Sequence, residues 1–129
     1  MILRLGVTGL PSNRQRRKAT GLSFVEIAAT FHQGVRPQTL AKWRADLPDD
    51  VGLVVRGHRD LTFPRKDSPG AGLLRDSEDV EAAWAHTLHA AKAARAAGVV
   101  LISPADFTPT DRHRDALAKA GARIAEELP

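Results

Sequence analysis

The sequence predicts an α/β fold in which four strand–helix units build one parallel sheet. Short aliphatic runs alternate with longer segments whose apolar residues recur at helical spacing. Capping and turn residues bound these segments. The 129 residues suffice for one domain with a modest core. On this pattern alone, the sheet is either open and doubly wound or half of an eight-stranded barrel.

The first two units occupy the stretch up to Pro48. Residues 2–8, ILRLGVT, predict a strand, and a short connection follows in which Ser12 can cap a helix and Gly21 can end it. Residues 23–30 predict the second strand. The next helix begins near Pro37, which suits a first helical turn. Its apolar residues at helical spacing are Leu40, Trp43 and Leu47.

The third unit begins with residues 52–58, GLVVRGH, which predict a strand. Residues 59–76 hold prolines and glycines among charged residues and predict a loop. Ser77 is placed to cap a long helix, and Gly98 to end it. The apolar stripe of this helix comprises Val80, Ala83, Trp84, Leu88 and Ala91.

The fourth unit begins with residues 99–103, VVLIS, as a strand. Thr110 is placed to cap a last helix that runs to about Leu128. The residues expected to face inward from this helix are Leu117, Ala120, Ile124 and Leu128.

Composition excludes several classes of protein. The chain has no cysteine, so disulfides, thiolate metal sites and cysteine catalysis are excluded. No apolar run reaches the length of a membrane span, and the first residues lack the layout of a signal peptide. We therefore expect a soluble, cytoplasmic protein. The net charge of +4 comes from residues 1–25, which carry five basic side chains and no acid.

Two short motifs carry a resemblance to a known family. Residues 6–10, GVTGL, follow a strand ending Gly-x-Ser-Gly-aromatic, and residues 25–32, VEIAATFH, follow the pattern Val-Glu-Ile-Asn-x-Thr-Phe-Tyr. Further matches are Pro37 with Trp43, Val55-Arg56, and the stretch from Pro104 to Phe107. In this order the motifs resemble the domain-of-unknown-function 72 family. The resemblance implies a TIM-barrel-like fold, of which this chain would supply about the first half.

The same comparison exposes departures from the family pattern. Leu10, Ala28, His32, Arg56 and Ile102 stand where the family has an aromatic residue, asparagine, tyrosine, lysine and glutamine. Several inward polar positions are therefore lost, which predicts weak catalysis or none. The biochemical role of the family is largely unassigned, so the resemblance implies a fold rather than a reaction.

Four strand–helix units cannot close a barrel of eight strands. The first and fourth strands would be open edges, and exposed edges favour pairing with another chain. We therefore predict association, either as a homo-oligomer or with a complementary half-barrel chain. The alternative is a monomer whose helices cover the edges.

Glu26 is unexpected in an apolar strand, because a buried carboxylate is costly unless it is paired. Strand alternation places it on the same side as Arg56 of the neighbouring strand, and adjacent strands lie about 4.8 Å apart. A Glu26–Arg56 ion pair is therefore predicted. It is either architectural or, together with His58, the catalytic set of an enzyme in which Glu26 is the general acid or base.

Further polar residues lie at or just beyond predicted strand ends, where barrel enzymes build their sites. They are Thr8, Thr30, His32, His58, Arg59 and Asp106. The histidines could share a proton or bind a metal with Glu26 or Asp106, or they could simply be solvated. No compact metal-ligand spacing occurs, so we predict neither a metal nor a cofactor.

The basic run 13–18, NRQRRK, lies in the first connection and so at the same end of the sheet. With Arg59, its predicted anion-binding residues are Arg14, Arg16, Arg17 and Lys18. The function expected first is a half-barrel subunit of an oligomer that presents an anion-binding face, without strong catalysis. The alternatives are an enzyme for a phosphorylated or anionic substrate and a nucleic-acid-binding protein that uses run 13–18.

Overall fold

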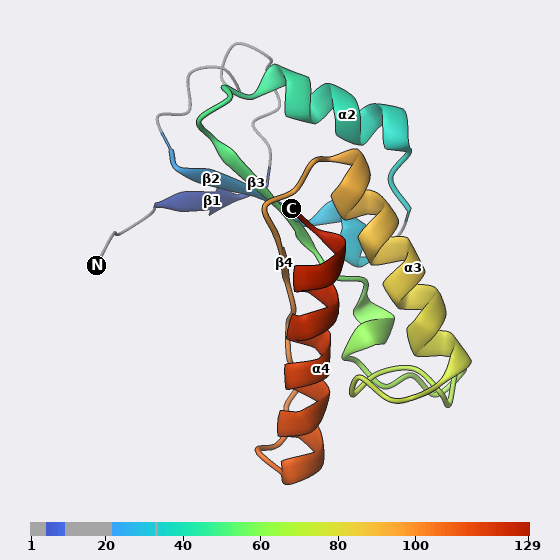
Figure 1. The fold of residues 1–129 in the computed structure, drawn as a ribbon. Coiled ribbons are helices and arrows are strands. Elements are labelled where there is room, and N and C mark those ends of the chain that lie inside the picture. The colour runs from blue at the N-terminus through green and yellow to red at the C-terminus, as the bar shows by residue number, and fades with distance from the viewer. Residues whose placement is uncertain (1–4, 10–21, 33) are drawn as a thin grey trace.

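A computed structural model describes residues 5–9, 22–32 and 34–129. Its centre is a four-stranded sheet in which every neighbouring pair is parallel. The strands are β1 (Gly6–Thr8), β2 (Phe24–Ile27), β3 (Gly52–Arg56) and β4 (Gly98–Val100), and they lie side by side in that order. The predicted α/β class with a parallel sheet is confirmed (Figure 1).

The described α-helices are α2 (Pro37–Asp46), α3 (Glu78–Ala93) and α4 (Asp111–Glu127). Two short 3₁₀ helices, η1 (Ala29–Phe31) and η2 (Arg59–Leu61), follow β2 and β3. The predicted caps form: the Ser77 hydroxyl accepts the N–H of Val80, and the Thr110 hydroxyl accepts the N–H of His113. Local sequence chemistry therefore fixes where α3 and α4 begin.

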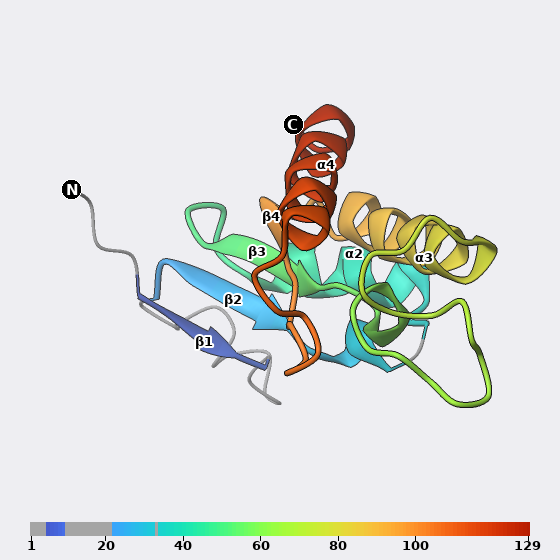
Figure 2. The same ribbon diagram turned by 90° about the horizontal axis from the view of Figure 1, so that it is seen from below.

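Side-chain alternation divides the sheet into two different faces. Val25, Ile27, Leu53 and Val55 are buried in a core that also includes residues of α2, α3 and α4. Figure 2 shows these three helices on one side of the sheet. Among the described residues no α-helix covers the opposite side. We call this opposite side the inner face, and its members are Phe24, Glu26, Val54, Arg56 and Val100, all half-buried.

The first strand ends at Thr8 as predicted, but β2, β3 and β4 end earlier than the sequence predicts, β4 already at Val100. The second strand stops at Ile27 because the chain turns into η1, and the third stops at Arg56. The prediction that Gly98 ends the long helix is wrong, because α3 stops at Ala93. Arg95 takes the left-handed conformation there (φ 50°), and Gly98 opens β4.

The inward position predicted for Leu117 is also wrong, since this side chain is 44% exposed. Leu128, just after α4, lies in the core against the sheet, and Ala120 of α4 lies in a second apolar cluster with Trp84 and Leu88. Ile124 packs against both, so these three residues face inward as predicted, and His113 is buried as well. Leu117 lies outside this stripe. No helix among the described residues has the length and apolar character needed to cross a membrane.

Candidate functional site

The inner face carries an ion pair between two neighbouring strands. Glu26 of β2 lies opposite Val54 of β3, so Arg56 is two residues further toward the carboxyl end. Arg56 Nε donates a hydrogen bond of 2.7 Å to Glu26 Oε1, and Nη2 contacts the same oxygen. The Arg56 and Glu26 side chains are only 22% and 12% exposed. The predicted pair therefore forms, and each charge compensates the other within the sheet.

Residues of η1 contact the side chain and the backbone of Arg56. The guanidinium carbon of Arg56 lies 5.9 Å from the centre of the Phe31 ring, a cation–π distance. Phe31 in turn meets Phe63 edge to face, with 5.6 Å between ring centres. The fully buried Thr30 donates its hydroxyl to the carbonyl oxygen of Arg56 at 2.6 Å. Thr30 therefore braces η1 against the end of β3 rather than pointing toward a ligand.

His58 follows β3 and turns toward α3. The backbone N–H of His58 donates to the hydroxyl of Thr87, and the ring Nδ1 of His58 accepts the backbone N–H of Asp60 at 3.2 Å. Its ring centre lies 4.9 Å from that of His86, at an angle of 69°. Burial lowers the pKa of His58, and the nearby Asp60 carboxylate opposes this only in part. The neutral imidazole is therefore favoured, with its Nδ1 lone pair already in use.

His86 is the residue that sequence reasoning missed. Its ring packs against that of His58, and its Nε2 is buried with no hydrogen-bond partner among the described residues. Gly34 leaves the space, since a Cβ there would lie 3.3 Å from His86 Cε1. The available signal was helical spacing, because position 86 shares a face with the buried Ala83 and Ala90.

The other residues predicted at the carboxyl ends of the strands make no described contact with the His58–His86 pair. His32 is exposed and meets Phe31 edge to face, with 4.8 Å between ring centres. Thr8 is exposed on β1, opposite Glu26 in the strand register, and Asp106 is exposed in the loop after β4. Within the described ranges, no group of three or more histidine, cysteine or acidic side chains could hold a metal ion.

The basic residues proposed for anion binding fall into two groups. Arg59 is half-exposed, and its Nε lies 3.7 Å from Asp60, which also accepts hydrogen bonds from Arg65. Its charge is therefore partly compensated. Arg14, Arg16, Arg17 and Lys18 lie outside the described residues.

Four parallel strands in chain order, with α-helices packed on one face, define an α/β protein. A family model described as "Protein of unknown function DUF72" matches residues 9–129. The chain belongs to this family, and the resemblance seen in its motifs is confirmed.

Among solved structures, the chain is similar to a DUF72 family protein from Enterococcus faecalis V583. The TM-score is 0.54 and the sequence identity 17%, so the likeness concerns the fold. The match covers 91% of this chain and 45% of that protein, so this chain spans about half the length of its relative. No curated protein matches.

Proposed function

We propose that the chain is a half-barrel subunit whose inner face binds a second half barrel, supplied by another copy of the same chain. The observation that carries this proposal is the Glu26–Arg56 pair on a sheet face that no described α-helix covers. Phe24, Val54 and Val100 provide apolar surface beside the pair. Such a mixture of apolar and paired polar groups is typical of an interior rather than of a solvated surface.

The sheet edges support the same proposal. β1 and β4 are the outermost strands of the described sheet, and each pairs with only one neighbour. Their outer N–H and C=O groups can accept a further parallel strand. Leu5 and Val7, at the β1 edge, are 62% and 40% exposed. Val7 lies opposite Val25 in the strand register, so this apolar surface is on the helical side of the sheet, where a helix of the second half barrel would cover it.

Anion binding is the second part of the proposal. Arg56 uses Nε and Nη2 for Glu26, and a guanidinium group has further N–H donors that suit a carboxylate or phosphate. The basic run 13–18 lies in the connection between β1 and β2 and adds positive charge there. The subunit would thus bind an anion at the mouth of the completed barrel without acting as a strong catalyst.

Light scattering after size exclusion tests the association. We expect a mass of about 28 kDa, twice the 13.9 kDa of one chain. Val54→Lys places a charge on the inner face and should give a folded monomer, as judged by circular dichroism. Ala85→Lys adds the same charge to an exposed position of α3 and should stay dimeric. A monomeric wild-type protein at about micromolar concentration would refute self-association.

An enzyme acting on an anionic substrate is the second candidate. It is favoured by the position of Glu26 and Arg56 near the carboxyl ends of β2 and β3, the end at which barrel enzymes build their sites. Glu26→Gln separates the two proposals. Unchanged turnover of a phosphorylated substrate by the folded variant would exclude Glu26 as the acid or base.

A further inference from the structure

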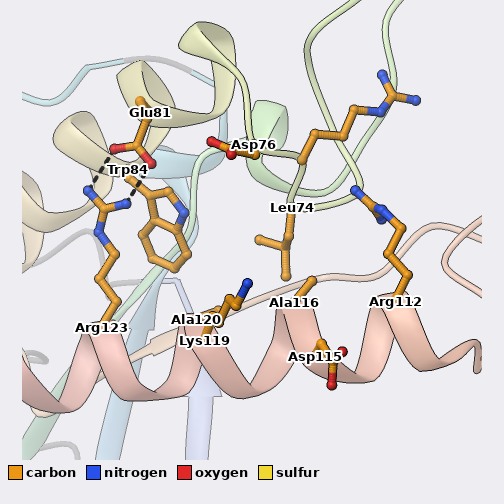
Figure 3. A pocket seen from close by; sticks show the side chains of 11 residues that line it. Leu74, Asp76, Glu81, Trp84, Arg112, Asp115, Ala116, Lys119, Ala120 and Arg123 are labelled. Atoms are coloured by element: carbon orange, nitrogen blue, oxygen red, sulfur yellow. Dashed lines mark hydrogen bonds and ion pairs between the residues drawn. The ribbon is translucent and has the colours of Figure 1, made fainter.

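A cavity of about 720 Å³ lies on the helical side of the sheet, between α3, the segment 74–76 and α4. Figure 3 shows its side chains, which come from all three elements. Sites for small molecules commonly have volumes of about 300–1,000 Å³. This groove is distinct from the inner face, because α3 and α4 pack on the opposite side of the sheet.

The floor of the groove is apolar. Leu74 and Trp84 face Ala116 and Ala120 of α4 across it, and Trp84 is only 5% exposed. Two alanines in successive turns keep the α4 wall flat. The floor therefore offers a surface on which the flat or aliphatic body of a ligand can lie.

Two arginines that line the groove, Arg75 and Arg112, donate hydrogen bonds to backbone carbonyl oxygens. Arg75 Nη1 donates to the carbonyls of Pro69 at 2.6 Å and Ala71 at 3.1 Å. Arg112 Nη1 donates to the carbonyl of Leu73 at 3.2 Å. These bonds orient the guanidinium groups, no carboxylate of the described residues forms an ion pair with either, and further N–H donors are available to a carboxylate or phosphate.

One end of the groove is closed by a compensated pair. Arg123 donates to both carboxylate oxygens of Glu81, at 2.8 and 3.0 Å, and lies over the Trp84 ring at 5.2 Å. Figure 3 places this pair at the far end of α4 from Arg112. Among the other charged lining residues are Asp76, Asp115 and Lys119, so the lining as a whole has one net positive charge. Arg123 is engaged by the Glu81 carboxylate, whereas the printed contact of Arg112 is to a backbone carbonyl, so an anionic group is favoured at the Arg112 end.

Residues 73 and 74, at the edge of the groove, have unfavourable backbone conformations. Leu73 and Leu74 are both left-handed, with φ of 55° and 49°, a conformation that is unfavourable for a residue other than glycine. Their N–H groups donate to the carbonyls of Thr62 and Leu61, which holds the strained turn in place. The turn presents the Leu73 carbonyl to Arg112 and the Leu74 side chain to the groove. Strain of this kind concentrates at binding sites.

We propose that this groove binds a small organic anion, with its carboxylate or phosphate on Arg75 and Arg112 and its apolar body against Leu74, Ala116 and the part of Trp84 that Arg123 leaves uncovered. The site belongs to the helical layer and so goes beyond the proposed association of the inner faces. It remains accessible whether or not a second half barrel binds, because the two surfaces lie on opposite sides of the sheet.

Nuclear magnetic resonance can locate binding, since the chain has only two tryptophans, Trp43 and Trp84. The probes are phenyl phosphate and phenylacetate, which share the apolar ring and differ in the anion. Inorganic phosphate and benzyl alcohol each lack one half of the predicted ligand. We expect at least one anionic probe to shift the indole N–H signal of Trp84 saturably, while the Trp43 signal of α2 stays unchanged.

The double variant Arg75→Gln/Arg112→Gln should bind this probe at least about tenfold more weakly, the loss expected for charge-assisted hydrogen bonds. Arg114→Gln is the matched control, because Arg114 lies on α4 outside the groove and pairs with Asp111. The proposal is overturned if neither probe shifts Trp84 saturably, if the double variant binds as wild type, or if inorganic phosphate binds as tightly as phenyl phosphate.

Discussion

Removing either member of the Glu26–Arg56 pair should destabilise the protein, and removing both should cost less than the sum. Glu26→Gln keeps the shape of the side chain and an oxygen that can accept from Arg56, but it removes the negative charge that compensates the guanidinium. Arg56→Met keeps an apolar stem over Phe31 but leaves the carboxylate of Glu26 without its cation. The double variant removes both charges from the inner face.

The magnitude follows from the exposure of the pair. Two unit charges about 4 Å apart attract by about 4 kcal/mol at an effective dielectric constant of 20. Desolvation of both groups offsets part of this attraction, and the side chains keep 22% and 12% of their exposure. We therefore expect a coupling free energy of about 1–3 kcal/mol, compared with about 0–1 kcal/mol for a surface pair.

Urea denaturation, followed by circular dichroism at several protein concentrations, measures the four free energies of the cycle. The coupling is the departure of the double variant from additivity. A coupling below about 0.5 kcal/mol would refute the argument, because the pair would then behave as a solvated surface pair. As a control, the unfolding free energies of all four proteins should depend on urea concentration with the same slope, which shows that each exposes the same surface on unfolding.

Two further predictions concern the segment after β3. The folded-state pKa of His58 is lowered from its usual 6.5, so the stability from its neutral form is complete above pH 6.5 and is lost as pH falls through the folded pKa. His58→Asn keeps an acceptor for the N–H of Asp60 and should flatten this dependence in pH-dependent urea titrations. Gly72 has φ of 87°, and a Cβ there would lie 2.3 Å from the nitrogen of Pro64. Gly72→Ala should therefore cost about 2 kcal/mol or more in the same assay, and a loss below about 0.5 kcal/mol would contradict this close approach.

The sequence was sufficient to predict the features that depend on local chemistry and on strand alternation. Ser77 and Thr110 marked the starts of α3 and α4, because a hydroxyl there satisfies an otherwise free backbone N–H. Alternation along neighbouring parallel strands was enough to pair Glu26 with Arg56, since both side chains had to share one face.

Features that depend on distant contacts could not be predicted. Thr30 was expected to continue a strand, but its hydroxyl bonds the carbonyl of Arg56, 26 residues further along the chain. The contact of His86 with His58 depends on how α3 packs against the end of β3. The groove beside Trp84 depends on how α4 lies relative to α3, which no local pattern specifies.

The strands follow one another across the sheet in chain order, and all run parallel. If two copies close one barrel, β4 of each copy must lie beside β1 of the other, and both junctions must again be parallel. A two-fold rotation about the barrel axis meets this requirement. It would gather the carboxyl ends of all strands at one rim, so that the Glu26–Arg56 pairs of both copies line one shared chamber. One symmetric ligand could then contact both subunits, and its binding would stabilise the dimer.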